Sequence, residues 1–509
     1  MEAVRATIES VLAIDPGAEA LEFEGRWASW GQLARTQAAL RGHLATLGRS
    51  GRVAVFMRNR PEILCATLAC IAEGQCLVTI NPVYPDDQVA EDLSAVAAPV
   101  IIASARDWAR PAVAAAAVAS GALCLEVAGL EVGGEVCVKA GPSGPLAEFP
   151  RAFAPGVAVE MLTSGTTGKP KRIPLEAAAY EKALLGAALF EGGRKADDPA
   201  QLRSGVSILT NGFAHTSGLM GSVGFVLAGR KACLLDRFRV SEFADALRRH
   251  RPKVAGAPPA ALRMLMDARP DPDTFSSLLA FRTGTAPLDP DLADAFYETY
   301  GVPVLQNYGA TEFGGVAGWT MPDFKAHRLD KRGSVGRLNP GVEGRAVELD
   351  THEPLEPGSP GVLQLKGPRI GDGVNWLTTT DLAIVDADRF VFILGRADNA
   401  IIRGGFKVHA EDVIKALQEH PAVLEAAVVG VADVRLGQAP VAACVLRNGA
   451  AATAEELLLF ARGRLAPYQI PTRLKVVEDL PRTTSMKVSQ PELRALFTAD
   501  QNEKEGETA

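Results

Sequence analysis

Apolar runs of strand length alternate with helical stretches through the first ~400 residues, and this alternation constrains the fold more than any other feature of the sequence. Val53–Phe56 has the composition of a buried strand, and Pro61–Ala72 begins with proline and spaces its apolar residues as a helix does. Leu77–Ile80 follows as a second strand. Further strands are expected at 99–103, 205–209, 231–235 and 254–256. The alternation predicts an α/β protein built in layers.

The character of the sequence changes twice beyond this part, and 509 residues are too many for one hydrophobic core. Residues 333–392 form short runs rich in Val, Leu, Gly and Asp, which indicates a β-rich subdomain. After a polar break at Gly395–Asp398, segments at 408–418, 423–431, 441–446 and 454–465 suffice for a small α+β domain. We therefore expect a large multi-layer N-terminal domain of stacked β-sheets with helices at 1–395, a C-terminal domain at 396–497 and a charged, disordered tail at 498–509.

Composition excludes several classes of function. The net charge of −7 and the pI of about 5.7 argue against a nucleic-acid partner, which needs a basic face. We expect no membrane span, because no apolar run reaches about 20 residues, and no signal peptide. Seven scattered cysteines without a Cys-x-x-Cys pair indicate thiols in a reducing compartment, so a cytoplasmic location is expected. The histidines show no His-x-x-x-His pattern, and a structural metal is not expected.

The most informative segment is a strand that ends in a loop of glycines, hydroxyls and lysines. Its residues are Thr163, Ser164, Gly165, Thr166, Thr167, Gly168, Lys169, Pro170 and Lys171. Glycines let backbone N–H groups approach a ligand, and successive N–H groups in one concavity bind anions. The lysines add positive charge, so the natural ligand is a triphosphate. The spacing does not fit Gly-x-x-x-x-Gly-Lys-[Ser/Thr], which disfavours an ordinary P-loop NTPase. An ordinary surface loop is the alternative.

Five further motifs follow in a fixed order. They are Asn307–Glu312, Gly333–Arg337 with Pro340-Gly341, Thr380–Leu382, Gly395–Asp398 through Gly404-Gly405, and Leu480–Lys487. With the phosphate loop, these motifs resemble the adenylate-forming (AMP-binding) superfamily, in its acyl- and aryl-CoA synthetase branch. The resemblance covers residues 53–496. It implies ATP-dependent activation of a small carboxylic acid to an acyl-AMP with release of pyrophosphate, then transfer to coenzyme A. The implied cofactors are ATP, Mg²⁺ and coenzyme A.

The resemblance also implies roles for the residues that bind the nucleotide. The phosphate loop, with Thr163, Ser164, Gly165, Thr166, Thr167, Gly168 and Lys171, would hold the β- and γ-phosphates. Tyr308 would stack on adenine between Asn307 and Gly309, as a flat apolar face suits. Thr311 would contact the α-phosphate, and Glu312 would be the magnesium ligand, since Mg²⁺ takes carboxylate oxygen. Asp381 would accept hydrogen bonds from both ribose hydroxyls, and Arg396 would assist at the ribose or at a phosphate.

Further residues are implied for the acid and for the change between the two half-reactions. Lys487 would neutralise charge between the acid carboxylate and the α-phosphate. The small domain would be mobile and swing about Asp398, and Gly404 and Gly405 would then approach the thiol channel. The expected acyl pocket consists of His215, Gly284, Thr285, Ala286, Phe313 and Gly314. No Asp lies between residues 211 and 235, which disfavours activation of an amino acid.

The sequence departs from the family pattern at several positions. Met486 stands where a glycine usually precedes the lysine, Thr380 stands where a glycine precedes the ribose-binding Asp, and Arg172 follows Lys171 where glycine is common. Two alternatives therefore remain beside the acid–CoA ligase. One is a stand-alone adenylating enzyme that loads a separate carrier protein, and the other is a non-catalytic nucleotide-binding homologue. A homodimer is the expected assembly from symmetry base rates.

Overall fold

The structure is a computed structural model that describes residues 1–163, 171–189, 198–349, 351–368, 370–396, 401–403, 406–433, 436–483 and 486–506. The described residues up to 314 form one compact unit, and those from 315 onward form a second. Each unit is described by itself.

The first unit alternates helices and strands, as the sequence predicts. Its helices are α1 (Glu2–Ile14), α2 (Trp30–Leu44), α3 (Pro61–Ala72), α4 (Asp86–Val96), α5 (Ala105–Trp108), α6 (Pro111–Ala119), α7 (Ala177–Leu189), α8 (Thr216–Leu227), α9 (Val240–His250), α10 (Pro259–Ala268) and α11 (Pro290–Tyr300). Its strands are β1 (Glu19–Phe23), β2 (Arg26–Ser29), β3 (Arg52–Phe56), β4 (Cys76–Ile80), β5 (Val100–Ser104), β6 (Leu123–Val127), β7 (Val136–Ala140), β8 (Val157–Thr163), β9 (Lys171–Glu176), β10 (Arg203–Leu209), β11 (Arg230–Leu234), β12 (Val254–Gly256), β13 (Ala280–Thr283) and β14 (Val304–Ala310).

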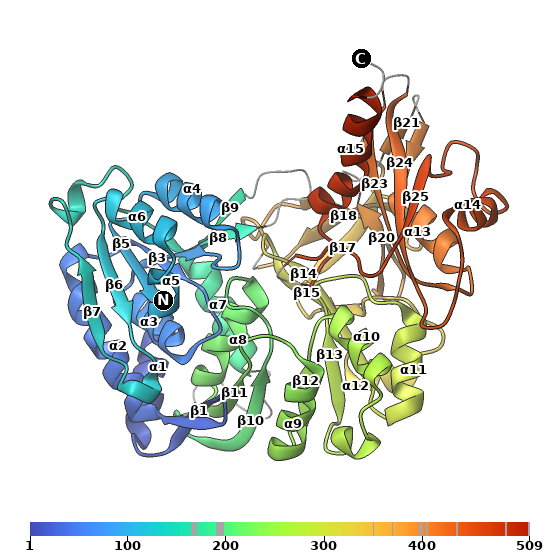
Figure 1. Cartoon of the computed structure of the whole chain (residues 1–509). Coiled ribbons are helices and arrows are strands. Elements are labelled where there is room, and N and C mark those ends of the chain that lie inside the picture. Colours follow the sequence, from blue (N-terminus) through green and yellow to red (C-terminus); the bar gives the residue numbers. More distant parts are fainter. Residues whose placement is uncertain are drawn as a thin grey trace. The chain divides into compact units, whose positions relative to one another are not determined.

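A seven-stranded sheet organises the N-terminal part, in the order β7-β6-β5-β3-β4-β8-β9 (Figure 1). Its inner pairs are parallel, and the pairs at the two edges, β7–β6 and β8–β9, are antiparallel. Successive side chains of a strand point to opposite faces, and β3 is buried on both. Val53 and Val55 face the cluster that contains α3, whereas Ala54 and Phe56 face the cluster that contains α4 and α6.

A layer of helices lies between this sheet and a second one, in the order β10-β11-β1-β2. Helix α3 packs against β3, β4 and β5, α8 packs against β10 and β11, and α3 contacts α8. Every residue of α3 is buried, because the helix has neighbours on all sides. The parallel strands β12, β13 and β14 follow, and Phe243, Phe275, Phe281 and Phe296 form the centre of their core.

A buried ion pair lies within the seven-stranded sheet. Arg52 on β3 donates to both carboxylate oxygens of Glu160 on β8, at 2.9 and 2.6 Å, although β4 runs between the two strands. The arginine is 1% exposed, and its remaining nitrogen donates to the carbonyl oxygens of Val96 and Arg151. All three guanidinium nitrogens are therefore hydrogen-bonded, as a buried charge requires.

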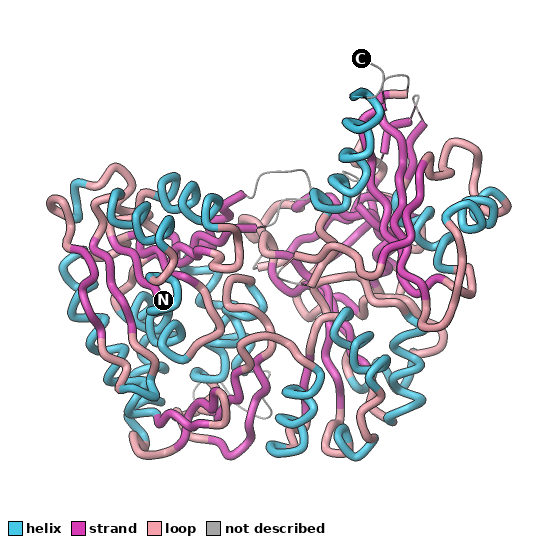
Figure 2. Tube along the Cα trace, in the orientation of Figure 1, coloured by secondary structure: helices cyan, strands magenta, loops and turns pink. Residues whose placement is uncertain are grey.

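The second unit is richer in strands (Figure 2). Its strands are β15 (Gly314–Gly318), β16 (Arg337–Leu338), β17 (Glu343–Val347), β18 (Pro360–Lys366), β19 (Leu377–Val385), β20 (Val391–Arg396), β21 (Ile401–Arg403), β22 (Phe406–Val408), β23 (Val423–Asp433), β24 (Gly437–Leu446) and β25 (Arg473–Val477). Its helices are α12 (Met321–His327), α13 (Ala410–Gln418), α14 (Ala454–Arg462) and α15 (Gln490–Gly506).

The strands of the second unit form two main sheets. In sequence, these sheets fall within the parts predicted to be β-rich and α+β. The first is an antiparallel meander, β17-β18-β19-β20. The second contains β22-β21-β24-β23, with β25 parallel to β24. Its two faces are covered by different helices: Ala426 and Val428 of β23 lie in the cluster with α13 and α14, and Val429 lies in the cluster with Leu493 and Phe497 of α15.

The predicted start of the C-terminal domain and the predicted start of the tail can be set against these elements. The sheet changes after Arg396, where β20 ends, which agrees with a C-terminal domain from 396, although that boundary itself stays a prediction. Helix α15 is described to Gly506, and the expected disorder of residues 498–509 stays a prediction. The residues after Phe497 carry no large apolar group, but Glu, Lys and Gln favour helix and extend one already anchored by Leu493 and Phe497.

Two sequence expectations about the environment of the chain can be compared with the structure. Across the described residues no helix is both long and apolar enough to cross a membrane. All seven cysteines are free, and six of them are buried, with Cys137 as the exposed one. Burial raises the pKa of the six buried thiols, for example of Cys444 to about 12, so these six act as small apolar side chains.

Gly336, in the motif Gly333–Arg337, has a structural reason to be glycine. Its φ is +103°, and a Cβ there would lie 2.1 Å from the carbonyl carbon of Gly318. We expect Gly336→Ala to lower the free energy of unfolding by about 2–4 kcal/mol, because strain and a backbone clash add.

The matched control is Gly341→Ala. Gly341 also has a positive φ, +78°, but a Cβ there meets no atom within 4 Å. Only the left-handed backbone is then penalised, by about 1 kcal/mol. Urea denaturation of both variants measures the difference, and equal losses would contradict this account of Gly336.

Candidate active site

The phosphate loop predicted from sequence lies between two paired strands. Strand β8 ends at Thr163, β9 begins at Lys171, and these two residues are register partners in an antiparallel pair. The predicted Ser164, Gly165, Thr166, Thr167 and Gly168 lie outside the described residues. The strand that enters the motif is thus as expected, and both strands belong to the seven-stranded sheet.

Arg172, one of the departures from the family pattern, has a defined place on β9. Its guanidinium donates to both carboxylate oxygens of Asp92 on α4, at 2.7 and 2.6 Å, and to the backbone carbonyl of Thr79 on β4, at 3.0 Å. The side chain joins the strand after the loop to the centre of the sheet. An arginine here therefore stabilises the edge of the sheet instead of leaving a charge beside the loop.

Thr311 contacts the beginning of α8 directly. Its Oγ1 lies 2.9 Å from Oγ1 of Thr216, the first residue of that helix. Thr216 Oγ1 also donates to Sδ of Met161 on β8, at 3.0 Å, which leaves Thr311 as the donor of the first bond. The end of β8, the start of α8 and the residue after β14 thus meet at one place within the first unit. The N–H groups of the first helical turn give this place a partial positive charge.

His215 is the residue that precedes α8, and a buried asparagine holds its loop. The backbone N–H of His215 donates to Gly212 O at 3.0 Å. Asn59 accepts from Phe213 N at 2.8 Å and donates to Leu235 O at 3.0 Å, and it is only 4% exposed. Gly218 must be glycine, because a Cβ would lie 2.1 Å from Gly212 O. The loop that carries His215 is therefore fixed from both sides.

The other expected pocket residues lie at the ends of β13 and β14. Gly284 follows β13 and packs closely on Asn307, since a Cβ there would lie 2.6 Å from the side-chain oxygen of Asn307. Thr285 has a φ of +70°, a left-handed conformation that is rare for a β-branched residue and typical of functional turns. The Tyr308 and Phe313 rings are 5.9 Å apart, centroid to centroid.

The residues around the ends of β13 and β14 differ in their exposure to solvent. Phe313 is buried, whereas Glu312 and Gly314 are exposed, and Ala286 and Tyr308 are half-buried. An exposed carboxylate on a rigid turn suits a hydrated Mg²⁺, which keeps several waters and takes one or two carboxylates.

In the second unit, Asp381 and Arg396 are direct neighbours. They are register partners on the antiparallel strands β19 and β20. Arg396 donates to the hydroxyl of Thr380, so the residue that replaces the usual glycine holds the arginine in place. Gly395, with a φ of +140°, leaves room for the Glu411 carboxylate of α13, which a Cβ would approach to 2.6 Å. Burial raises the pKa of Glu411.

Lys487 is exposed at the end of a tight turn. Thr483 N donates to Lys487 O at 2.7 Å, and Met486 N donates to Thr483 O at 2.9 Å. Met486 has a φ of +63°. The family glycine at this position is thereby explained: the turn needs a left-handed residue, and methionine adopts that conformation at a cost. The predicted hinge Asp398 and the glycines Gly404 and Gly405 lie outside the described residues.

Sequence reasoning missed three residues of this site, Asn59, Met161 and Thr216. None belongs to a recognisable motif, and their contacts join segments that are far apart in the chain. One signal was available for Asn59, because it follows β3 at the carboxyl end of a parallel strand, where ligand sites of α/β sheets usually lie.

Comparison with known proteins identifies the family of the chain. Residues 8–374 match the family model of the AMP-binding enzyme, and residues 415–487 match the model of the AMP-binding enzyme C-terminal domain. The chain belongs to the AMP-binding enzyme family.

Relatives of this AMP-binding enzyme span its whole length. It is 29% identical to a 2-succinylbenzoate–CoA ligase from Bacillus velezensis, over 95% of this chain and 96% of that protein. It is 28% identical to an indoleacetate–CoA ligase from Aromatoleum aromaticum, over 96% and 97%. The ATP-bound structure of MatB from Rhodopseudomonas palustris superposes with a TM-score of 0.78 at 25% identity, over 97% of this chain and 99% of that one.

These findings confirm three predictions: the layered α/β fold, the adenylate-forming family, and an enzyme of the acid–CoA ligase (AMP-forming) class with ATP, Mg²⁺ and coenzyme A as its cofactors. The roles of individual site residues are not tested by them.

The strained turn before Lys487 yields a stability prediction. We expect Met486→Gly to raise the free energy of unfolding by about 0.5–1 kcal/mol. Glycine removes the penalty for the left-handed backbone, and the greater entropy of the unfolded glycine chain offsets part of this gain. Met264→Gly is the control: Met264 is exposed on α10, where glycine costs about 1 kcal/mol. Chemical denaturation measures both, and a loss of stability in Met486→Gly would show that the turn is not strained.

Proposed function

We propose that this acid–CoA ligase activates a monocarboxylic acid whose remaining part is uncharged. The observation behind the proposal is the chemical character of the candidate acyl pocket in the first unit. The names of the relatives include substrates as different as 2-succinylbenzoate and indoleacetate, so they do not select an acid for this chain.

The candidate pocket offers little to a second charged group. Residues 211–228, which comprise the loop before α8 and the helix itself, contain His215 as their one titratable side chain. Gly284, Thr285, Ala286, Phe313 and Gly314 are uncharged. A second carboxylate buried among such residues lacks a partner, and an unpaired buried charge is costly. A neutral aliphatic or aromatic remainder suits small and apolar neighbours.

For the first half-reaction, we propose that Thr311 and the start of α8 receive the charge that develops where two anions meet. A carboxylate oxygen of the acid bonds to the α-phosphorus while the bond from that phosphorus to the pyrophosphate oxygen breaks. The N-terminal N–H groups of α8 are fixed donors at this place, and the hydroxyl of Thr311, which donates to Thr216 in this structure, would turn to donate to the phosphate. Fixed donors stabilise a transition state without reorganising during the reaction.

The other expected site residues take the roles that the family resemblance implies. The loop with Thr163, Ser164, Gly165, Thr166, Thr167, Gly168 and Lys171 holds the β- and γ-phosphates. Asn307, Tyr308 and Gly309 hold the adenine. Glu312 would hold Mg²⁺, which supplies charge neutralisation on the phosphates. Asp381 and Arg396 bind the ribose as neighbours on β19 and β20.

In the second half-reaction the thiolate of coenzyme A attacks the acyl carbonyl and AMP leaves. We propose that residues 396–497 then move about Asp398, so that Lys487 leaves and Gly404 and Gly405 approach the thiol. Large rigid-body changes about a few residues are typical of multistep enzymes. A cytoplasmic location and a homodimer belong to the same proposal, and transfer to a carrier protein is the alternative fate of the acyl group.

The role of Lys487 is tested by pyrophosphate release with Mg-ATP and acid, with and without coenzyme A. We expect Lys487→Ala to lower the rate of adenylation at least 100-fold, because the charge it supplies acts in the transition state. Lys415→Ala is the control, since Lys415 is an exposed lysine on α13. Equal rates in the two variants would remove Lys487 from the mechanism. Adenylation that coenzyme A does not accelerate would favour a carrier protein, and ATP binding without turnover would favour a non-catalytic homologue.

The substrate proposal is tested with matched pairs of acids. Butyrate and succinate share a four-carbon chain, and phenylacetate and 2-carboxyphenylacetate share a ring. In the preferred pair we expect kcat/KM to be at least about 10-fold higher for the monocarboxylate than for the dicarboxylate. A difference of about 10-fold is the lower limit of the cost of burying one unpaired charge. A preference for the dicarboxylate of either pair would refute an uncharged pocket.

A further inference from the structure

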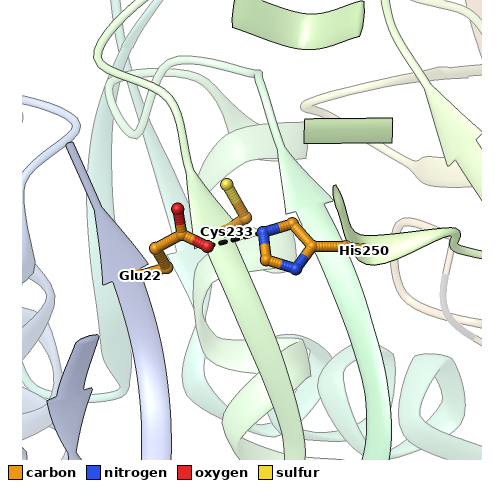
Figure 3. Close-up of side chains that lie close together, drawn as sticks. All are labelled: Glu22, Cys233 and His250. Carbon is orange, nitrogen blue, oxygen red and sulfur yellow. Dashed lines mark ion pairs between the residues drawn. The ribbon is translucent and has the colours of Figure 1, made fainter. Parts of the chain in front are cut away.

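A second cluster of reactive side chains lies away from the candidate active site. Glu22 and Cys233 are register partners on the parallel strands β1 and β11, and His250 is the last residue of α9. Figure 3 shows the three side chains pointing toward one another from three segments. One ligand atom of each residue lies within 4.8 Å of the others, and no other such group occurs among the described residues.

Glu22 is a buried carboxylate with only half of its hydrogen-bonding capacity in use. Its side chain is 2% exposed. Oε1 accepts from Arg249 at 2.5 Å, whereas Oε2 has no hydrogen-bond partner. Oε2 nevertheless lies 2.5 Å from Nε2 of His250. A buried oxygen without a donor is rare and calls for a physical explanation.

The ring nitrogen of His250 faces the same point. Its Nε2 lies 3.0 Å from Nη1 of Arg249, and arginine can only donate, so Nε2 presents a lone pair. This contact and the ion pair with Glu22 place Nε2 2.5 Å from Oε2 at the centre of the cluster. A metal ion at this point would take the lone pair that now accepts from Arg249 and would bind Oε2 at the same time.

The third group selects the kind of cation. Sγ of Cys233 adds a soft donor to one nitrogen and one oxygen, a set that suits Zn²⁺ rather than Mg²⁺ or Ca²⁺. A thiol binds a metal as its thiolate, so metal binding at this site releases a proton from Cys233. Arg249 can keep its bonds to Oε1 of Glu22 and to Asp245, which lies 2.7 Å away, so the local charges stay balanced.

We propose that Glu22, Cys233 and His250 form a binding site for one zinc-like divalent cation, with Oε2, Sγ and Nε2 as ligands and water in the fourth position. The Glu22–His250 distance opens on binding, since two ligands at about 2.0 Å from zinc lie farther apart than 2.5 Å. The ion would join β1, β11 and α9. The sequence pattern predicts no structural metal because these ligands are 211 and 17 positions apart, beyond any local motif.

Cobalt titration of the chelator-treated protein tests the proposal without reference to turnover. Co²⁺ bound by a thiolate shows an intense thiolate-to-metal charge-transfer band. We expect wild-type protein to show the band at one equivalent, Zn²⁺ to displace it, and Zn²⁺ to raise the melting temperature by several degrees, because a ligand of the folded state stabilises it. Proton release on binding should accompany the band.

The variants separate a metal site from a structural cluster. Cys233→Ala should lose the band and the thermal shift, whereas Cys444→Ala, which changes another buried cysteine in a sheet, should keep both. His250→Gln provides a second lesion and should weaken Co²⁺ binding at least 10-fold. A wild-type protein without the band, or Cys233→Ala with an unchanged one, would overturn the proposal. The cluster would then be an ion-pair network of Glu22, Arg249 and His250 that joins β1 to α9.

Discussion

The buried ion pair between Arg52 and Glu160 holds the strand on which the candidate active site depends. Removal of either partner leaves an uncompensated charge inside the sheet, which costs several kcal/mol. Next to Glu160 on β8, the hydroxyl of Thr79 accepts from Leu162 N at 3.1 Å and donates to Glu160 O at 3.3 Å, so a side chain continues the pairing of β4 with β8. Met161, between these anchored residues, accepts the hydrogen bond from Thr216. The end of β8, the start of α8 and Thr311 are thus anchored to the centre of the sheet.

The sequence predicted what depends on local pattern and on motifs. The bounds of α3 and β12 agree with expectation, because a proline start, helical spacing and a short apolar run are local signals. The opposition of Asp381 and Arg396 follows from their motifs on one hairpin. Asn59 and Thr216 were not predictable, since their contacts depend on which strands become neighbours.

The departures from the family pattern acquire physical meaning in the structure. Arg172 pairs with Asp92 and binds Thr79, Thr380 accepts a hydrogen bond from Arg396, and Met486 occupies a left-handed turn. The first two substitutions add contacts that glycine cannot make. The third adds strain beside an exposed lysine, so the loop that carries Lys487 is less favourable in this conformation than a glycine loop. All three leave the expected charged groups in place.

Gly336 shows that a residue of a family motif can be kept for folding and not for catalysis. Its backbone conformation and its contact with Gly318 demand glycine for folding alone. A descendant that abandoned catalysis would still be selected to keep this residue, because a misfolded chain is degraded whatever its activity. Lys487, which is exposed and supports no core, would be free to drift in the same lineage. A retained glycine motif is therefore evidence that the fold persists, whereas a retained lysine is evidence that the chemistry persists.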